Sequence, residues 1–159
     1  MKSDMVKLVT FRLGPEIFAA EVASVERVLR YTVPSSVPDV PDWIAGVLEH
    51  HSGVMPVVDL RRRVELPDVT VTAETRILIF STNAGAIGAV VDAVLAVASV
   101  PAGSISAPPP LFRGLAAEFV RGIAKLDDRL AVILDVDRVL SSADRIVLEQ
   151  ALQGAATRG

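Results

Sequence analysis

The stretch GVLEHHSGVMPVVDLRR, residues 46–62, has a counterpart in GIAKLDDRLAVILDVDR, residues 122–138. Both begin with glycine, pass through a short polar turn, and end in an apolar run followed by Asp and Arg. The identical pairs are Gly46 and Gly122, Asp59 and Asp135, and Arg62 and Arg138. The match indicates an internal repeat, in which two copies of one supersecondary unit build the fold.

A second pair of segments extends the repeat toward the N-terminus. KLVTF, residues 7–11, pairs with RILIF, residues 76–80, so that the copies cover about residues 7–64 and 76–140. A unit of this size buries too little apolar surface to be stable alone. We therefore expect a single domain over residues 1–159, in which the two copies share one hydrophobic core.

Most of the chain is patterned as short strands. The runs RILIF (76–80), AIGAVV (86–91) and LAVIL (130–134) are apolar at successive positions, which predicts strands covered on both faces. Residues that favour turns separate these runs. Pro56 predicts an edge strand or a bulge, because proline cannot donate a hydrogen bond to a ladder. The predicted fold is mainly β.

Helices are predicted to be few and short. LRRR (60–63) and VDRVL (136–140) read as helical turns, and each follows an aspartate, Asp59 or Asp135, that is suited to capping it. Acidic residues flank the three arginines, which predicts a solvated surface and not a nucleic-acid contact. Apolar side chains at four-residue spacing predict a C-terminal helix at about residues 141–153.

Composition and charge exclude several classes of function. The 159 residues carry a net charge of −3 and no cysteine, so the chain offers neither a basic nucleic-acid footprint nor thiolate metal ligands. No apolar run approaches the roughly 20 residues of a membrane span. The N-terminal residues lack the apolar block of a signal peptide. We expect a cytoplasmic protein without a nucleic-acid partner and without membrane insertion.

The only two histidines, His50 and His51, are adjacent and raise the question of a metal or catalytic site. On a strand, neighbouring side chains point to opposite faces, so the two rings could share one metal ion only if a turn distorted the strand. In the second copy Asp127 and Asp128 stand at the places of His51 and Ser52, which is typical of a turn. We therefore predict an exposed hairpin turn, and no catalytic, cofactor-binding or metal-binding residues.

Longer motifs in both copies resemble the CheW family of chemotaxis coupling proteins. AAEFVRGIAKLDDRLAVILDVDRVL (116–140) matches the second half of the family pattern almost position by position. VPDVPDWIAGV (37–47) and VMPVVDLRRR (54–63) match the first half. The resemblance covers about residues 6–140. It implies two small five-stranded barrels packed on a shared core, with short helices.

The same resemblance implies a function and a set of contact residues. It implies a non-catalytic adaptor, without a cofactor, that couples the cytoplasmic tip of a methyl-accepting chemoreceptor to the regulatory domain of a CheA-type histidine kinase. The family's receptor groove falls on Val25 and Gly46, and its kinase contact on the segment around Arg27. Its Asn-Leu-Arg-Gly turn falls on residues 49–52. The protein-binding residues predicted in this way are Val25, Arg27, Val28, Gly46, Glu49, His50, His51 and Ser52.

At two places the sequence departs from the family pattern. Arg27 stands where members commonly carry a glutamate, which reverses the charge of a contact position. In the turn, a histidine replaces the forked and permanently charged arginine, which removes bidentate pairing. These changes support an alternative hypothesis, in which a divergent CheW-like protein binds the receptor or another partner but not the kinase.

Two hypotheses from other classes are disfavoured by the sequence. A small-ligand carrier would need a cavity, and a five-stranded barrel filled by Val, Ile and Leu is too narrow to leave one. A hydrolase built on His50 or His51 with Asp59 would lack a recognisable nucleophile.

Overall fold

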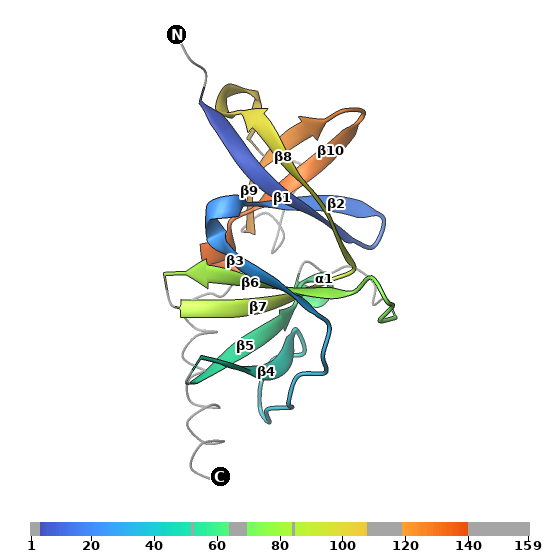
Figure 1. The fold of residues 1–159 in the computed structure, drawn as a ribbon, viewed down its shortest axis with the longest axis vertical. Helices are drawn as coiled ribbons and strands as arrows, with labels where there is room; N and C mark the ends of the chain where they lie inside the picture. Colours follow the sequence, from blue (N-terminus) through green and yellow to red (C-terminus); the bar gives the residue numbers. More distant parts are fainter. Residues whose placement is uncertain (1–3, 52, 64–69, 84, 108–118, 140–159) are drawn as a thin grey trace.

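The computed structural model describes residues 4–51, 53–63, 70–83, 85–107 and 119–139 (Figure 1). The strands in these ranges are β1 (Met5–Leu13), β2 (Glu16–Glu21), β3 (Val25–Arg30), β4 (Ile44–His50), β5 (Gly53–Asp59), β6 (Arg76–Thr82), β7 (Gly85–Val91), β8 (Ala93–Pro101), β9 (Val120–Leu126) and β10 (Arg129–Leu134). The helices are α1 (Leu60–Arg63) and three 3₁₀ turns, η1 (Val22–Ser24), η2 (Ala102–Ser104) and η3 (Val136–Arg138). The mainly β prediction is confirmed. The C-terminal helix predicted at about 141–153 lies outside the described residues.

The strands form two five-stranded sheets with equivalent strand orders. The first sheet has the order β8-β1-β2-β10-β9 and the second β3-β6-β7-β5-β4. Under the sequence repeat, β1 to β5 correspond to β6 to β10, and this correspondence converts one order into the other. In Figure 1 the first sheet lies above the second. Each copy of the repeat therefore supplies two strands to one sheet and three to the other.

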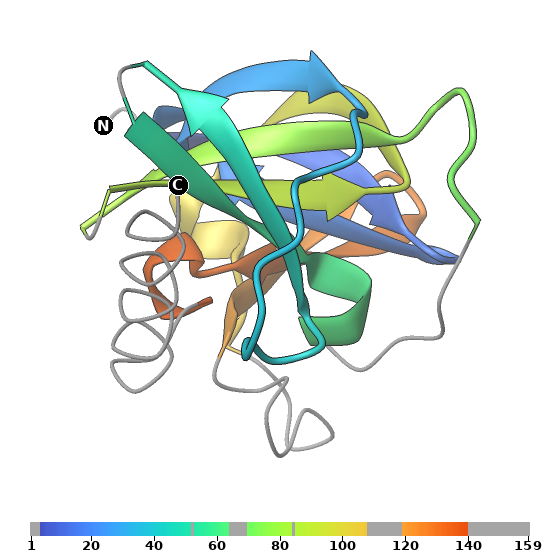
Figure 2. The ribbon, with the colours of Figure 1, turned by 90° about the horizontal axis from the view of Figure 1, so that it is seen from below.

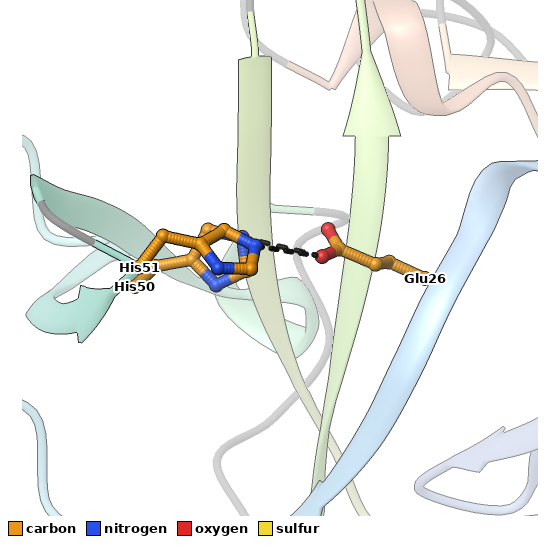
Figure 3. A group of neighbouring side chains, drawn as sticks. All are labelled: Glu26, His50 and His51. Atoms are coloured by element: carbon orange, nitrogen blue, oxygen red, sulfur yellow. Dashed lines mark hydrogen bonds and ion pairs between the residues drawn. The ribbon is translucent and has the colours of Figure 1, made fainter.

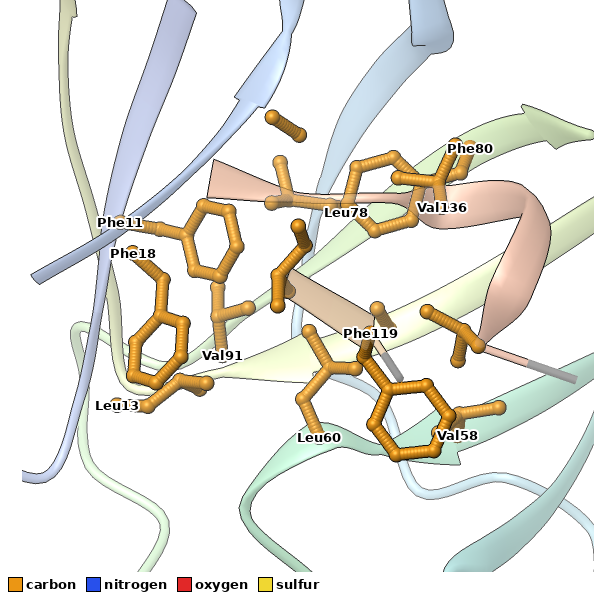
Figure 4. Packing of buried hydrophobic residues seen from close by; sticks show 14 of the residues in the cluster. Phe11, Leu13, Phe18, Val58, Leu60, Leu78, Phe80, Val91, Phe119 and Val136 are labelled. Carbon is orange, nitrogen blue, oxygen red and sulfur yellow. The ribbon is translucent and has the colours of Figure 1, made fainter. Parts of the chain in front are cut away.

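A hydrophobic cluster between the two sheets forms the shared core (Figure 4). Phe11 of β1 and Phe80 of β6 occupy equivalent positions of the repeat, and both are fully buried in this cluster. Two smaller clusters belong to one sheet each. The first contains Leu8, Ala19, Val100, Ala124, Ala131 and Ile133, and the second contains Val57, Ile77 and Val90. The predicted shared core is confirmed.

The strands predicted to be covered on both faces are confirmed by their burial. On β10, Val132 and Leu134 enter the shared core, whereas Ile133 enters the smaller cluster of the first sheet. Successive side chains of one strand thus reach different clusters, because they point to opposite faces. Because both faces of the strand are buried, its sequence is a continuous apolar run.

Both predicted capping aspartates are confirmed. The carboxylate of Asp59 accepts a hydrogen bond from the backbone N–H of Arg61 at 3.1 Å, and Asp135 accepts one from the backbone N–H of Asp137 at 3.2 Å. Each aspartate satisfies a backbone donor that has no partner within the helical turn. The two copies therefore end in the same way.

The edge-strand alternative for Pro56 was wrong, because β5 lies inside the second sheet between β7 and β4. The bulge alternative fits better, because the β4–β5 ladder shifts register next to the pair of Val47 and Pro56. Pro56 pairs with Val47, whose backbone N–H and C=O both bond to Ser35 instead. On the other side, the β5–β7 ladder begins one residue later, at Val57 and Gly88. Neither neighbour needs the N–H that proline lacks, so an interior strand tolerates it.

In each sheet, the segment that follows one edge strand forms an isolated β-bridge with the edge strand at the opposite end of the sheet. Ser35 bridges to Val47 of β4, and Ser106 bridges to Ile123 of β9. Figure 2 shows the segment between β3 and β4 running alongside β4. The repeated glycines explain this close approach, because a Cβ on Gly46 would overlap the carbonyl oxygen of Ser35.

The arginine run also differs from its prediction. Arg61 is buried, and its guanidinium bonds to Asp59 and Asp92, so this residue is not part of a solvated face. Only Arg62 of the run is described as exposed. Within the described ranges, none of the helices has the length and apolar character needed to cross a bilayer.

Candidate functional site

The residues predicted to contact partners lie mainly on the two edge strands of the second sheet. β3 and β4 stand at opposite ends of its strand order. Arg27 and Val28 belong to β3, and Glu49 and His50 belong to β4. An edge strand keeps backbone groups and side chains available to another chain, which makes it a natural docking element.

Most of these side chains are accessible. Arg27, Glu49 and His51 are exposed, and Val28 keeps 44% of its surface exposed although it is apolar. His50 is half-buried. We call the set Arg27, Val28, Glu49, His50 and His51 the edge surface. Ser52, the last residue of the predicted turn, lies outside the described residues.

The structure places the other two predicted contact residues elsewhere. Val25 is half-buried and packs against the shared core between the sheets. Gly46 is buried, has a φ of 147°, and faces the backbone of Ser35. These positions give both residues a structural role, and their predicted contact with a receptor stays a prediction.

A side chain that sequence reasoning did not single out joins the two edges. The Nε2 atoms of His50 and His51 each lie 3.4 Å from Oε1 of Glu26 on β3 (Figure 3). The contact spans 25 residues of sequence. No local pattern around Glu26 indicates it, because the contact depends on how β3 and β4 approach across the sheet.

The two rings do not point to opposite faces, because the chain turns at His51, the one exception that the sequence allowed. Their centroids lie 4.2 Å apart, and both rings turn toward Glu26. The cause is the backbone of His51, which has a φ of 53° and therefore leaves the extended conformation at the turn. Strand alternation holds only while the chain stays extended.

The predicted turn itself is confirmed in both copies. Asp127, which corresponds to His51, has the same φ of 53°. Aspartate tolerates this left-handed conformation better than most residues, and histidine is also enriched there. The local backbone is thus common to the two sheets, whereas the side chains on it differ.

The cluster of Glu26, His50 and His51 is the one group in the described ranges that brings three metal-ligating side chains together. One ligand atom from each residue lies within 4.8 Å of the other two. Side-chain exposure rises from 17% for His50 through 32% for Glu26 to 77% for His51. Imidazole nitrogen and carboxylate oxygen suit divalent transition metals such as zinc.

Comparisons with known proteins agree with the fold. The family model described as CheW-like domain matches residues 7–144. "Chemotaxis protein CheW" of Bacillus subtilis is 31% identical over 147 residues, which cover 91% of this chain and 94% of that protein. "Chemotaxis protein CheW" of Klebsiella aerogenes is 27% identical over 139 residues, which cover 87% of this chain and 84% of that protein.

A solved structure shows the same architecture. The crystal structure of the scaffolding protein TtCheW from Thermoanaerobacter tengcongensis superposes with a TM-score of 0.82 at 27% sequence identity. The match covers 90% of this chain and 92% of that chain. Fold, family model and relatives agree along nearly the whole sequence, and the chain therefore belongs to the CheW family of chemotaxis scaffold proteins.

Proposed function

We propose that this protein is a non-catalytic cytoplasmic adaptor that couples the cytoplasmic tip of a methyl-accepting chemoreceptor to the regulatory domain of a CheA-type histidine kinase. The observation that carries the proposal is the edge surface. The segment matched to the family's kinase contact lies on β3, and the signature turn begins at the end of β4. Glu26, next to Arg27 on β3, lies 3.4 Å from both His50 and His51 and so brings the two segments together. One partner can therefore contact both segments at once.

The chemistry of the edge surface suits a protein partner. Val28 offers an exposed apolar side chain at an edge strand. Exposed charged groups of both signs lie on the two edge strands, Arg27 on β3 and Glu49 on β4. Apolar contact supplies affinity, while the charges set orientation and exclude wrong partners.

Calorimetric titration of the full chain against a receptor cytoplasmic fragment and a kinase regulatory domain, taken from the same genome, tests the proposal. We expect the chain to bind both. Binding to the receptor fragment alone would favour the alternative, a divergent member uncoupled from the kinase. Failure to bind either would overturn the proposal.

A charge-reversal pair locates the contact. Arg27→Glu changes the edge surface, and Lys7→Glu makes the same charge change at an exposed position of β1 in the other sheet. We expect Arg27→Glu to change the dissociation constant for the kinase domain by about tenfold or more, and Lys7→Glu to leave it within about twofold. Equal effects of the two variants would place the kinase contact elsewhere.

A graft tests whether the departures from the family pattern matter. Asn-Leu-Arg-Gly placed at positions 49–52 together with Arg27→Glu restores the pattern. If the natural residues weaken the kinase contact, the graft strengthens it. If the kinase has co-adapted to contact the natural residues, the graft weakens binding to that kinase.

A further inference from the structure

We infer that Glu26, His50 and His51 bind one divalent transition-metal ion of the zinc class, through Oε1 of the glutamate and one ring nitrogen of each histidine. The inference does not rest on the proposed function. It concerns a site that joins the two edge strands of the second sheet (Figure 3).

The separations between the groups are compatible with a shared metal ion. Zinc bonds of about 2.0–2.1 Å in a tetrahedron place neighbouring ligand atoms roughly 3.3–3.4 Å apart. Both Nε2 atoms lie 3.4 Å from Oε1 of Glu26. A direct N–H···O hydrogen bond is usually shorter, at about 2.7–3.2 Å. The glutamate oxygen thus lies at a distance from both rings that a shared metal would also give, and the present contacts are long for direct hydrogen bonds.

The backbone holds the ligands in place without the metal. His50 ends β4, and Leu48, two residues earlier on that strand, packs against the smaller hydrophobic cluster of the second sheet. His51 is turned toward the same side by its positive φ. Glu26 lies where the β3–β6 ladder shifts register, between Val25 and Arg27. Each ligand therefore comes from a different local geometry, and the three converge at one point.

The other sheet serves as an internal comparison. Under the repeat offsets, the positions of Glu26, His50 and His51 correspond to Leu95, Leu126 and Asp127. Asp127 keeps the turn, but Leu95 and Leu126 cannot ligate a metal. The same sheet topology thus forms with apolar residues at two of the three places. The fold therefore does not require the cluster.

Three protein ligands leave a fourth tetrahedral position. Because the His51 side chain is 77% exposed, solvent reaches the cluster, and water fills that position. Such a site resembles an open zinc site more than a closed structural one. The bound ion would connect edge strand β3 to the end of edge strand β4.

Titration of the metal-free full chain with Co²⁺, followed by displacement with Zn²⁺, tests the inference. Tetrahedral Co²⁺ absorbs far more strongly in the visible range than hydrated Co²⁺, and thus reports geometry as well as binding. We expect saturation at one ion per chain and loss of the absorption when Zn²⁺ is added. Because these are the only histidines and there is no cysteine, no other site in the chain can present two imidazoles or a thiolate.

Single variants locate the ion. His50→Ala, His51→Ala and Glu26→Gln should each weaken binding by at least about tenfold, since loss of even an outer-sphere partner of a metal ligand costs roughly 10–100-fold. Glu49→Gln is the matched control, because it removes the same charge from an exposed residue beside the histidines. It should leave the affinity within about twofold.

Two results would overturn the inference. One is the absence of saturable, tetrahedral Co²⁺ binding by the parent chain. The other is equal Co²⁺ binding by the parent and the His51→Ala variant. This substitution should leave the fold intact, because the His51 side chain is mostly solvent-exposed. A rise in melting temperature with added Zn²⁺ should likewise occur in the parent and Glu49→Gln, and disappear in His51→Ala.

Discussion

The guanidinium of Arg61 donates a hydrogen bond to the carboxylate of Asp92 over 3.1 Å, and both side chains are about 95% buried. Asp92 also accepts a hydrogen bond from the backbone N–H of Gly14, at 2.6 Å, in the turn between β1 and β2. Arg61 follows β5 of the second sheet, whereas Gly14 belongs to the first. The pair therefore connects the two sheets at the edge of the shared core.

Removing the arginine should strongly destabilise the protein. Arg61→Met leaves the Asp92 carboxylate buried without its cation, and we expect the free energy of unfolding to fall by about 3–5 kcal/mol in urea denaturation. Arg62→Ala, at the exposed neighbour, should cost no more than about 1 kcal/mol.

The partner residue provides a rescue experiment. Asp92→Asn keeps an oxygen for the N–H of Gly14 but removes the buried charge. Combined with Arg61→Met, it should recover part of the lost stability. A double variant no more stable than Arg61→Met would show that the arginine acts through packing and not through charge.

The shared core predicts cooperative unfolding. Phe11→Ala and Phe80→Ala remove equivalent rings from the two sheets, and each should lower the free energy of unfolding by about 3–5 kcal/mol, because both residues are fully buried in one cluster. In each variant the fluorescence of Trp43, which packs against this cluster, and far-UV circular dichroism should change in one transition. Separate transitions for the two probes would contradict a common core.

The bridge beside β4 requires glycine at position 46. Gly46→Ala places a methyl group against the carbonyl of Ser35 in a backbone conformation that alanine avoids, and it should destabilise the protein by well over 1 kcal/mol. Gly53→Ala on the adjoining strand meets no atom within 4 Å and should change the free energy of unfolding by less than about 0.5 kcal/mol. Thermal melts of the two variants compare them directly.

The capping aspartate of the second copy makes a smaller contribution. Asp135→Ala removes the acceptor for the N–H of Asp137, and we expect a loss of about 1 kcal/mol in urea denaturation. Asp135→Asn keeps an oxygen at the same place and should retain most of the stability. If both substitutions cost the same, the charge would matter more than the hydrogen bond, since Arg138 lies 3.5 Å from the same carboxylate.

Several features of the fold were predictable because they depend on residues close together in the chain. Apolar runs predicted the buried strands, and aspartates before helical turns predicted the caps. The repeat predicted equivalent turns at His51 and Asp127. The resemblance to a family supplied the two-sheet architecture. Each of these signals is carried within a short window, where side-chain periodicity and backbone preference act directly.

The failures have an equally physical cause. Pro56 predicted an edge strand or a bulge because proline lacks an N–H, and the edge alternative failed. The backbone of Val47, which pairs with Pro56, bonds to Ser35 and needs no donor from the proline. Arg61 was assigned to solvent because its neighbours are charged, although Asp92, 31 residues away, neutralises it in a buried position. In both cases the deciding partner lies far away in the sequence.

The sequence by itself determined the repeat, the strands, the turns and the family, since these follow from local patterns present in both copies. Only the tertiary structure decided how the copies exchange strands, with β3, β4 and β5 of the first joining β6 and β7 of the second. That exchange brings the edge strands β3 and β4 into one sheet and sets Glu26 against His50 and His51. Contacts of this kind arise from strand pairing and side-chain contacts over long sequence separations, which no local pattern encodes.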